Sequence, residues 1–206
     1  MDLFDIAKII HERLRAQTGH RGVPINTVAR GERTIADQIG TALHLRKLCG
    51  QSLMQDREVC ALLSRLNLHI EATQSAMVRA GIVKECADCA VNGEGTCCGV
   101  RTGYKCGSVL LLINLLLGRT LPPEPTDTHL CHFLTKQRRA LRARPVLCVN
   151  FICQRLRDVL PHNSLCNVQD IAGGELNTLF VLEECIKKKI GAATLIRAQK
   201  QRDEKM

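Results

Sequence analysis

Residues 86–107 read CADCAVNGEGTCCGVRTGYKCG, and this stretch decides the expected fold. Helical periodicity stops here, glycines accumulate, and cysteines recur within a short length of chain. Glycine permits backbone angles and close approaches that other residues resist, so such a stretch suits a loop wrapped around a bound group. We therefore expect a ligand loop from Lys84 to Gly107, whose candidate ligands are Cys86, Cys89, Cys97, Cys98 and Cys106.

A second group of cysteines follows farther along the chain. The run Cys131-His132-Phe133-Leu134 is followed by Arg144-Pro145-Val146-Leu147-Cys148 and then by Cys153. Pro145 fixes the backbone just ahead of Cys148, and Cys148 and Cys153 are close enough in sequence to approach one centre from the start of a helix. The expected ligands of the bound metal are therefore Cys86, Cys89, Cys97, Cys98, Cys106, Cys131, Cys148 and Cys153.

The two groups together resemble the YkgJ-type family of zinc- or iron-chelating cysteine-cluster domains. That family shows an early Cys-x-x-Cys group with adjacent cysteines, a later Cys-x-Phe-Leu, and an Arg-Pro-x-x-Cys element followed by another cysteine. The resemblance covers about residues 84–155 and implies a metal site rather than a particular reaction. This chain departs from the family in the seven residues between Cys89 and Cys97, and in the basic stretch 136–142 that stands where a cysteine is often found. We expect Cys106 to take the place of that cysteine.

The spacing favours an iron–sulfur cluster over zinc. A structural zinc ion needs four ligands in a tight tetrahedron, usually from two paired-cysteine turns. Here Cys86-x-x-Cys89 is one standard pair, and the other candidates are scattered between residues 97 and 153, as when a fold wraps a larger cluster. Zinc remains the alternative. We expect one centre, although eight thiols exceed the four that one cluster needs, so that two centres or spare thiols stay open.

The remaining cysteines and the nearby histidines are weaker candidates. His129 and His132 flank Cys131 and could replace a thiolate, but His132 is expected to be an ordinary surface or hydrogen-bonded residue. A lone cysteine in a helical stripe behaves as a small buried apolar group. This interpretation applies to Cys49, Cys60 and Cys185, while Cys166 lies away from both cysteine groups.

Composition predicts a mostly α protein, a helical bundle around the cysteine-rich region. Apolar residues make up 45% of the chain and aromatic residues only 2%, so the core must use Leu, Ile, Val and Ala. Apolar spacing predicts helices over 3–14, over 34–49 ended by Gly50, and from Ser52 to Gly81. A short buried helix is expected over 109–117, although periodicity alone does not distinguish it from a buried strand. Further helices are expected over 150–160 and from Gly174 into the charged tail. We expect an N-terminal helical region (1–83), a metal-binding region (84–155) and a C-terminal helical region (156–206), all within one compact domain.

Cysteine content and charge limit the function classes. Twelve cysteines, with acidic residues rather than a basic and apolar leader at the start, indicate a reducing compartment such as the cytoplasm. The apolar run 109–117 is too short to span a membrane. The net charge of +9 could suit nucleic acid, but the positive residues are spread out and aromatic residues for stacking are scarce. We therefore expect a redox or electron-transfer protein with an unknown protein partner, ahead of a zinc-binding interaction module and a basic nucleic-acid-binding zinc protein. No catalytic motif is present to indicate an enzyme.

Overall fold

The computed structural model describes residues 34–92, 99–127, 130–134 and 140–203. The chain divides into two units, one of residues 33–186 and the other of residues 1–32 with 187–206. The cysteine-rich region belongs to the first unit, which is described here. The helix expected over 3–14 lies outside the described residues.

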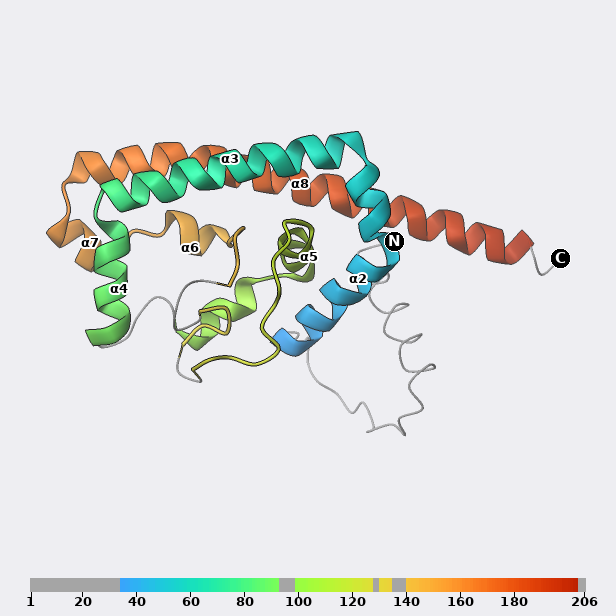
Figure 1. Cartoon of the computed structure of the whole chain (residues 1–206), viewed down its shortest axis with the longest axis horizontal. Helices are drawn as coiled ribbons and strands as arrows, with labels where there is room; N and C mark the ends of the chain where they lie inside the picture. The colour runs from blue at the N-terminus through green and yellow to red at the C-terminus, as the bar shows by residue number, and fades with distance from the viewer. Residues whose placement is uncertain (1–33, 93–98, 128–129, 135–139, 204–206) are drawn as a thin grey trace. The chain divides into compact units, whose positions relative to one another are not determined.

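Helices dominate the described chain (Figure 1). In order they are α2 (Ile35–Gln55), α3 (Arg57–Arg79), α4 (Ile82–Asn92), the 3-10 helix η1 (Val100–Lys105), α5 (Ser108–Leu116), α6 (Val146–Asn150), α7 (Gln154–Val159) and α8 (His162–Asp203). The described residues contain no strand, and Gly99 and Leu130 pair in an isolated antiparallel bridge. The expected mostly α fold is confirmed. No helix in the described part of the chain is long and apolar enough to cross a membrane.

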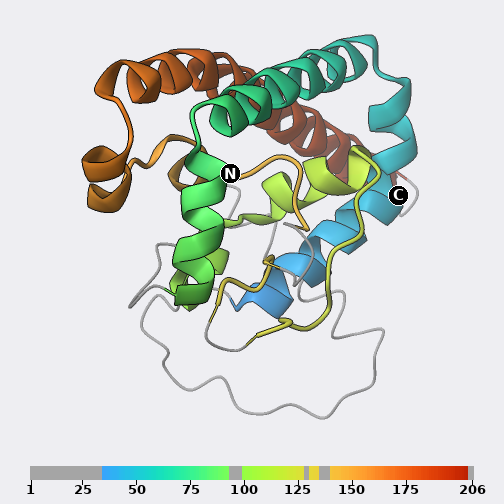
Figure 2. The same cartoon turned by 60° about the vertical axis from the view of Figure 1, so that its left-hand side comes forward.

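The core of the unit forms where α5 packs on α2, which in turn contacts α3 (Figure 2). Leu111, Leu112 and Ile113 are fully buried, so α5 is surrounded rather than half exposed. The amide of Ser108 donates to the side-chain oxygen of Gln38 at 2.9 Å, which fixes the start of α5 against α2. The short buried helix predicted over 109–117 is confirmed. In the structure, α5 begins and ends one residue earlier than predicted, at Ser108 and Leu116.

The part of α8 that belongs to this unit, residues 162–186, lies along α3 in both views (Figures 1 and 2). The hydroxyl of Thr178 and Nδ1 of His69 are hydrogen-bonded at 3.0 Å. Gly174 brings α8 close to α3, because a Cβ at this position would lie 3.2 Å from the His69 ring. The predicted start of the last helix near Gly174 is therefore wrong: α8 begins at His162, directly after Pro161, and this glycine serves close packing inside the helix.

The predicted ends of α2 and α3 agree with the structure at two positions and differ from it between them. Thr34 caps α2 in a capping box with Asp37, as the predicted start required. Gly81 follows the end of α3 with φ of 82°, an angle that favours glycine, so this predicted end is also confirmed. The predicted end of the preceding helix at Gly50 is wrong, because α2 continues to Gln55, and the cap of α3 is Asp56 rather than Ser52.

Two further segments differ from the sequence prediction. The loop expected from Lys84 to Gly107 is wrong over Ile82–Asn92, which forms α4, and over Val100–Lys105, which forms η1. The first glycine of the stretch, which would weaken a helix, comes only at position 93. The helix expected over 150–160 is two short helices, α6 and α7, separated by Phe151, Ile152 and Cys153. This break gives the chain the change of direction that a single helix would lack.

Candidate metal centre

Five of the eight predicted ligands line one cavity of about 80 Å³. They come from separate segments: α4, the residue after η1, the loop after Leu130, α6, and the residue before α7. The five are Cys86, Cys106, Cys131, Cys148 and Cys153. Because these positions are distant in sequence, their common location is a property of the tertiary fold.

Three of these thiols interact electrostatically. Cys106 is the most buried, with 2% of its surface exposed. Burial raises the pKa of the Cys106 thiol, and negative charge on Cys131 and on Cys148 raises that pKa further. Charge effects of this kind act between groups that lie close together. A bound cation would relieve the repulsion among these thiolates.

Helix α4 presents Cys86 to the cavity and is fixed to α7 by ion pairs. The guanidinium of Arg155 on α7 contacts Glu85 at 3.1 Å and also contacts Asp88, and both carboxylates belong to α4. These carboxylates raise the pKa of Arg155, chiefly through the hydrogen bonds that its guanidinium donates to Asp88 and then to Glu85. The contacts hold the segment before α7, which carries Cys153, beside α4.

The segment that leads into α6 is clamped by Asn114, a polar side chain buried within α5. Its amide oxygen accepts hydrogen bonds from the backbone amides of Arg142 at 2.7 Å and Ala143 at 3.1 Å. Its amide nitrogen donates to the Ala143 carbonyl at 2.9 Å. One side chain thus satisfies an irregular backbone stretch that has no helix of its own.

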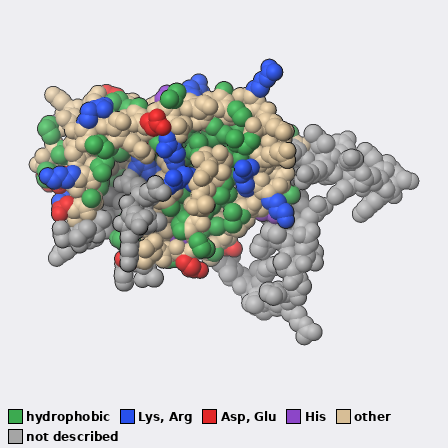
Figure 3. Space-filling model, viewed as in Figure 1, with side chains coloured by type: hydrophobic (Ala, Val, Ile, Leu, Met, Phe, Trp, Pro, Cys, Tyr) green, Lys and Arg blue, Asp and Glu red, His purple; other side chains and the backbone are tan. Residues whose placement is uncertain are grey.

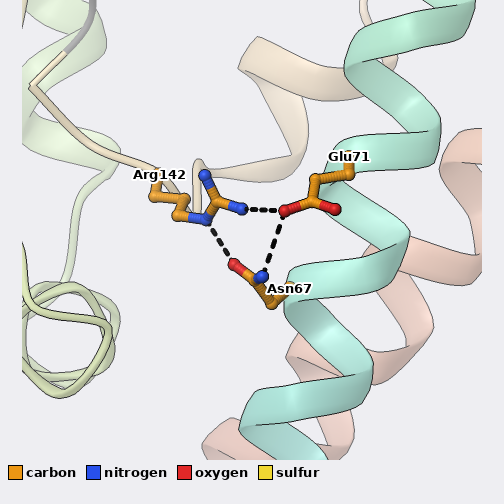
Figure 4. A network of polar contacts seen from close by, with 3 residues as sticks. All are labelled: Asn67, Glu71 and Arg142. Carbon is orange, nitrogen blue, oxygen red and sulfur yellow. Dashed lines mark hydrogen bonds and ion pairs between the residues drawn. The ribbon is translucent and has the colours of Figure 1, made fainter.

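The same segment is also tied to α3 by a polar network (Figure 4). Nη2 of Arg142 contacts Oε1 of Glu71 at 2.7 Å, and Nε of Arg142 donates to Asn67. Arg142 is therefore fixed through both its backbone and its side chain. The position of the next residues, including Cys148, follows from this attachment.

Pro145 begins α6, as the sequence indicated. It is the N-cap residue, and its carbonyl accepts a hydrogen bond from the Cys148 amide at 2.8 Å. Cys153 is the corresponding N-cap residue of α7. The two cysteines thus occupy the first turn of one short helix and the start of the next, and both line the cavity.

Cys131 is held near η1 by the backbone. Gly99, the residue before η1, pairs with Leu130 in the isolated bridge. The amide of Leu134 donates to the Cys131 carbonyl at 2.8 Å, which closes a tight turn. These contacts bring the Cys-x-Phe-Leu element beside the segment that ends at Cys106.

Apart from its thiols, the cavity is largely apolar. Its lining includes Ile82, Phe133 and Leu156, which are buried. Leu147 and Phe151 also line it and are 42% and 49% exposed, so they form an apolar lip where the cavity meets the surface. An apolar lining lowers the local polarity and restricts water around a bound group.

Other predicted ligands and alternatives are placed differently. Cys89 is half-buried on α4 and does not line the cavity, while Cys97, Cys98 and His129 lie outside the described residues. His132 is buried, and its Nε2 is hydrogen-bonded to the Pro122 carbonyl at 2.9 Å, so its interpretation as a hydrogen-bonded residue is confirmed. In the described ranges, no group of three or more His, Cys, Asp or Glu side chains has the spacing to hold one metal ion.

The cysteines outside the two groups are also away from the cavity lining. Cys185 is buried, as predicted. Cys49 and Cys60 are only half-buried, so they lie at the margin of the core rather than within it; each thiol donates to a backbone carbonyl of its own region, Leu45 and Met54 respectively. Cys166 lies 3.4 Å from Nε2 of His162 on the first turns of α8.

Sequence reasoning missed two buried charged residues near the cavity. Arg144 is 4% exposed and lines the cavity, and Glu175 on α8 has no exposed surface. A carboxylate in the apolar stripe formed by Ala172, Leu179 and Leu182 was a signal that could have revealed Glu175. Arg144 belongs to the Arg-Pro-x-x-Cys element of the sequence, but that element does not indicate that the side chain is buried, because its burial depends on the tertiary fold.

One face of the described chain shows how its positive charge is distributed (Figure 3). On the face shown in Figure 3, Lys and Arg side chains of the described residues are spread among apolar side chains rather than gathered in one patch. A nucleic-acid footprint normally concentrates positive charge along one face or helix.

Comparison with known proteins adds nothing to this description, because no protein-family model, curated protein or solved structure matches the chain. The resemblance to the YkgJ-type family therefore stays a prediction from the sequence.

Proposed function

We propose that the cavity binds an iron–sulfur cluster and that the protein transfers single electrons. The observation that supports this most strongly is the presence of five thiols from five segments on one largely apolar cavity. Cysteine thiolates are the usual ligands of such clusters, and a bound cluster supplies reversible one-electron chemistry. Cys106, Cys131 and Cys148 would provide three ligands, and Cys86 or Cys153 a fourth.

The size of the cavity favours a cluster over one zinc ion. By the same measure of volume, one water molecule needs about 10–15 Å³, so a cavity of about 80 Å³ has room for a group of several atoms. A zinc ion with bonds of about 2.3 Å to four sulfurs would fill the space among them and leave no such cavity. Five thiols on one cavity of this size are better suited to hold the several metal atoms of one cluster than a single ion.

Zinc binding by a structural module is the alternative. It is favoured by the negative charges of Cys131 and Cys148, which raise the pKa of the Cys106 thiol and which a zinc ion would neutralise. With Cys86 or Cys153 they would complete a four-sulfur set of the kind that structural zinc sites use. This alternative predicts a colourless protein without sulfide.

We also propose a cellular compartment and a kind of partner from the thiols and the apolar edge of the cavity. A thiol-rich site of this kind stays competent to bind metal in a reducing compartment such as the cytoplasm. The lip formed by Leu147 and Phe151 is the part of the cavity lining through which a protein redox partner would approach. The combination of Cys131-His132-Phe133-Leu134 with Arg144-Pro145 and Cys148 supports membership of the YkgJ-type family as part of this proposal.

Ligand variants test the site. We expect Cys106→Ser and Cys148→Ser, purified without oxygen, to lose most of their iron and acid-labile sulfide. Cys60→Ser is the matched control, because Cys60 lies on α3 away from the cavity and serine can still donate to the Met54 carbonyl. Full iron content in both ligand variants would refute the assignment, as would equal loss in the control.

A further inference from the structure

Arg144 is a buried cation in the wall of the cysteine cavity. Its side chain is 4% exposed, and Nη1 donates to the carbonyl of Cys148 at 3.3 Å. Nη2 lies 3.9 Å from the sulfur of Met77, which lines the same cavity. The guanidinium is thus directed to the wall that carries the thiols.

The charge of Arg144 is also felt by a buried carboxyl group. Burial raises the pKa of Glu175. The positive charge of Arg144 opposes this rise most strongly, and Thr73 and His69 lower the pKa to a smaller extent. The hydroxyl of Thr73 donates to the backbone carbonyl of His69, and neither carboxyl oxygen of Glu175 has a hydrogen-bond partner. Arg144 is therefore the main favourable influence on an ionised Glu175.

The other arginine near the cysteines has a different environment. Arg155 is paired with both Glu85 and Asp88, and 38% of its side chain is exposed. Its charge is balanced by two carboxylates and screened by water. Arg144 lines the cavity, where low polarity makes its charge act more strongly on neighbouring groups, among them Glu175.

We propose that Arg144 is the internal counter-ion of the thiolate centre and raises the reduction potential of the bound cluster. The inference rests on the proposed function. A cluster bound by several thiolates is anionic, and reduction adds a further negative charge. A fixed cation beside the cluster stabilises the reduced form more than the oxidised form, so the potential rises.

The reduction potential of the wild-type protein and its variants tests this role. In an anaerobic titration one electron from dithionite converts one ferric ion of the cluster to ferrous, and no bond to the protein forms or breaks. We expect Arg144→Gln, which keeps a donor for the Cys148 carbonyl, to lower the ratio of reduced to oxidised cluster about tenfold at a fixed ambient potential. This change corresponds to about 59 mV for a one-electron couple. Arg144→Lys is expected to retain most of the wild-type potential, because it keeps the charge.

The control is Arg65→Gln on an exposed position of α3, which removes the same charge far from any cavity-lining position. If Arg144→Gln fails to fold, Glu175→Gln tests the same role. At alkaline pH this substitution removes the negative charge that acts on Arg144, so the positive charge is less compensated and the reduction potential of the cluster is expected to rise. An unchanged potential in Arg144→Gln, at full iron content, overturns the role of Arg144, as does an equal shift in Arg65→Gln. Where only Glu175→Gln folds, an unchanged or lowered potential overturns it. A wild-type protein without iron and sulfide would instead refute the proposed function, and this inference would fall with it.

Discussion

The helical body formed by α2, α3 and α5 differs from the cysteine-lined region in how each is held together. In the body, long helices bury whole apolar stripes, and Leu66 and Leu112 have almost no exposed surface. The cavity region consists of η1, α6, α7 and irregular segments, each a few residues long, which are fixed by single side chains such as Asn114 and Arg155. Short segments bury too little apolar surface to offset their ordering entropy, so this region has most to gain from a bound metal.

Iron removal should separate the two regions most strongly. After anaerobic chelation we expect amide exchange to become much faster in residues 99–107, 130–134 and 140–160, while α3 and α5 keep their protection. The reason is that the body has its own apolar core, whereas the cavity segments lose their common ligand. Hydrogen exchange read by mass spectrometry checks this. Equal protection in both states would show that the cysteines do not hold the cavity region together.

A cavity-creating substitution in the body should have the opposite effect. Leu66 is fully buried, so Leu66→Ala is expected to lower the free energy of unfolding by about 2–5 kcal/mol. Iron content per folded protein should stay at the wild-type value, because Leu66 does not line the cavity. Urea unfolding and metal analysis measure the two quantities. Loss of iron in folded Leu66→Ala protein would show that the regions are coupled.

Asn114 joins the two regions and should affect both. Asn114→Ala leaves the buried amides of Arg142 and Ala143 without their acceptor and is expected to cost about 1–3 kcal/mol of unfolding free energy. Iron affinity should also fall, because this segment leads to Cys148. A chelator competition compared with that of Leu66→Ala separates the effects. Wild-type affinity in the Asn114 variant would mean that the clamp does not position the site.

The smallest expected effect concerns pH. Burial raises the pKa of Glu175 above its usual value of 4.5, although the charge of Arg144 opposes the rise. The folded state therefore keeps a proton that the unfolded state has lost, and the contribution of Glu175 to stability falls as pH rises above about 4.5 until its folded pKa is passed. Glu175→Gln should remove this decline. The measurement is the unfolding midpoint of metal-free wild-type and Glu175→Gln protein at a series of pH values above about 4.5. If the midpoints of the two proteins change with pH in parallel, the account is contradicted.

Local features of the fold were predictable and long-range ones were not. Thr34 and Gly81 were correctly assigned because capping and a positive φ depend on a few adjacent residues. Gly50 and Gly174 were misread as boundaries because a glycine can also lie inside a helix, and at Gly174 the reason is a tertiary contact with His69. At α4, the cysteines and the later glycines concealed an ordinary helix.

The same division applies to the site. The two cysteine groups were visible in the sequence, and the structure brings Cys86, Cys106, Cys131, Cys148 and Cys153 to one cavity. That Cys89 lies off the cavity could not be read from the Cys-x-x-Cys spacing, because the direction of each side chain depends on how α4 packs. Arg144 and Glu175 were missed for a similar reason. Arg144 precedes α6 and Glu175 lies on α8, and the effect of one charge on the other depends on a fold that brings these distant segments together.

X-ray absorption of the anaerobically purified wild-type protein tests the central claim most directly, namely that these thiols bind one iron–sulfur cluster. Spectra at the iron and zinc edges identify the metal and its neighbours in the same sample. The account predicts iron surrounded by sulfur with further iron atoms in the next shell, together with acid-labile sulfide. Zinc bound by four sulfurs, with no iron and no sulfide, would contradict it.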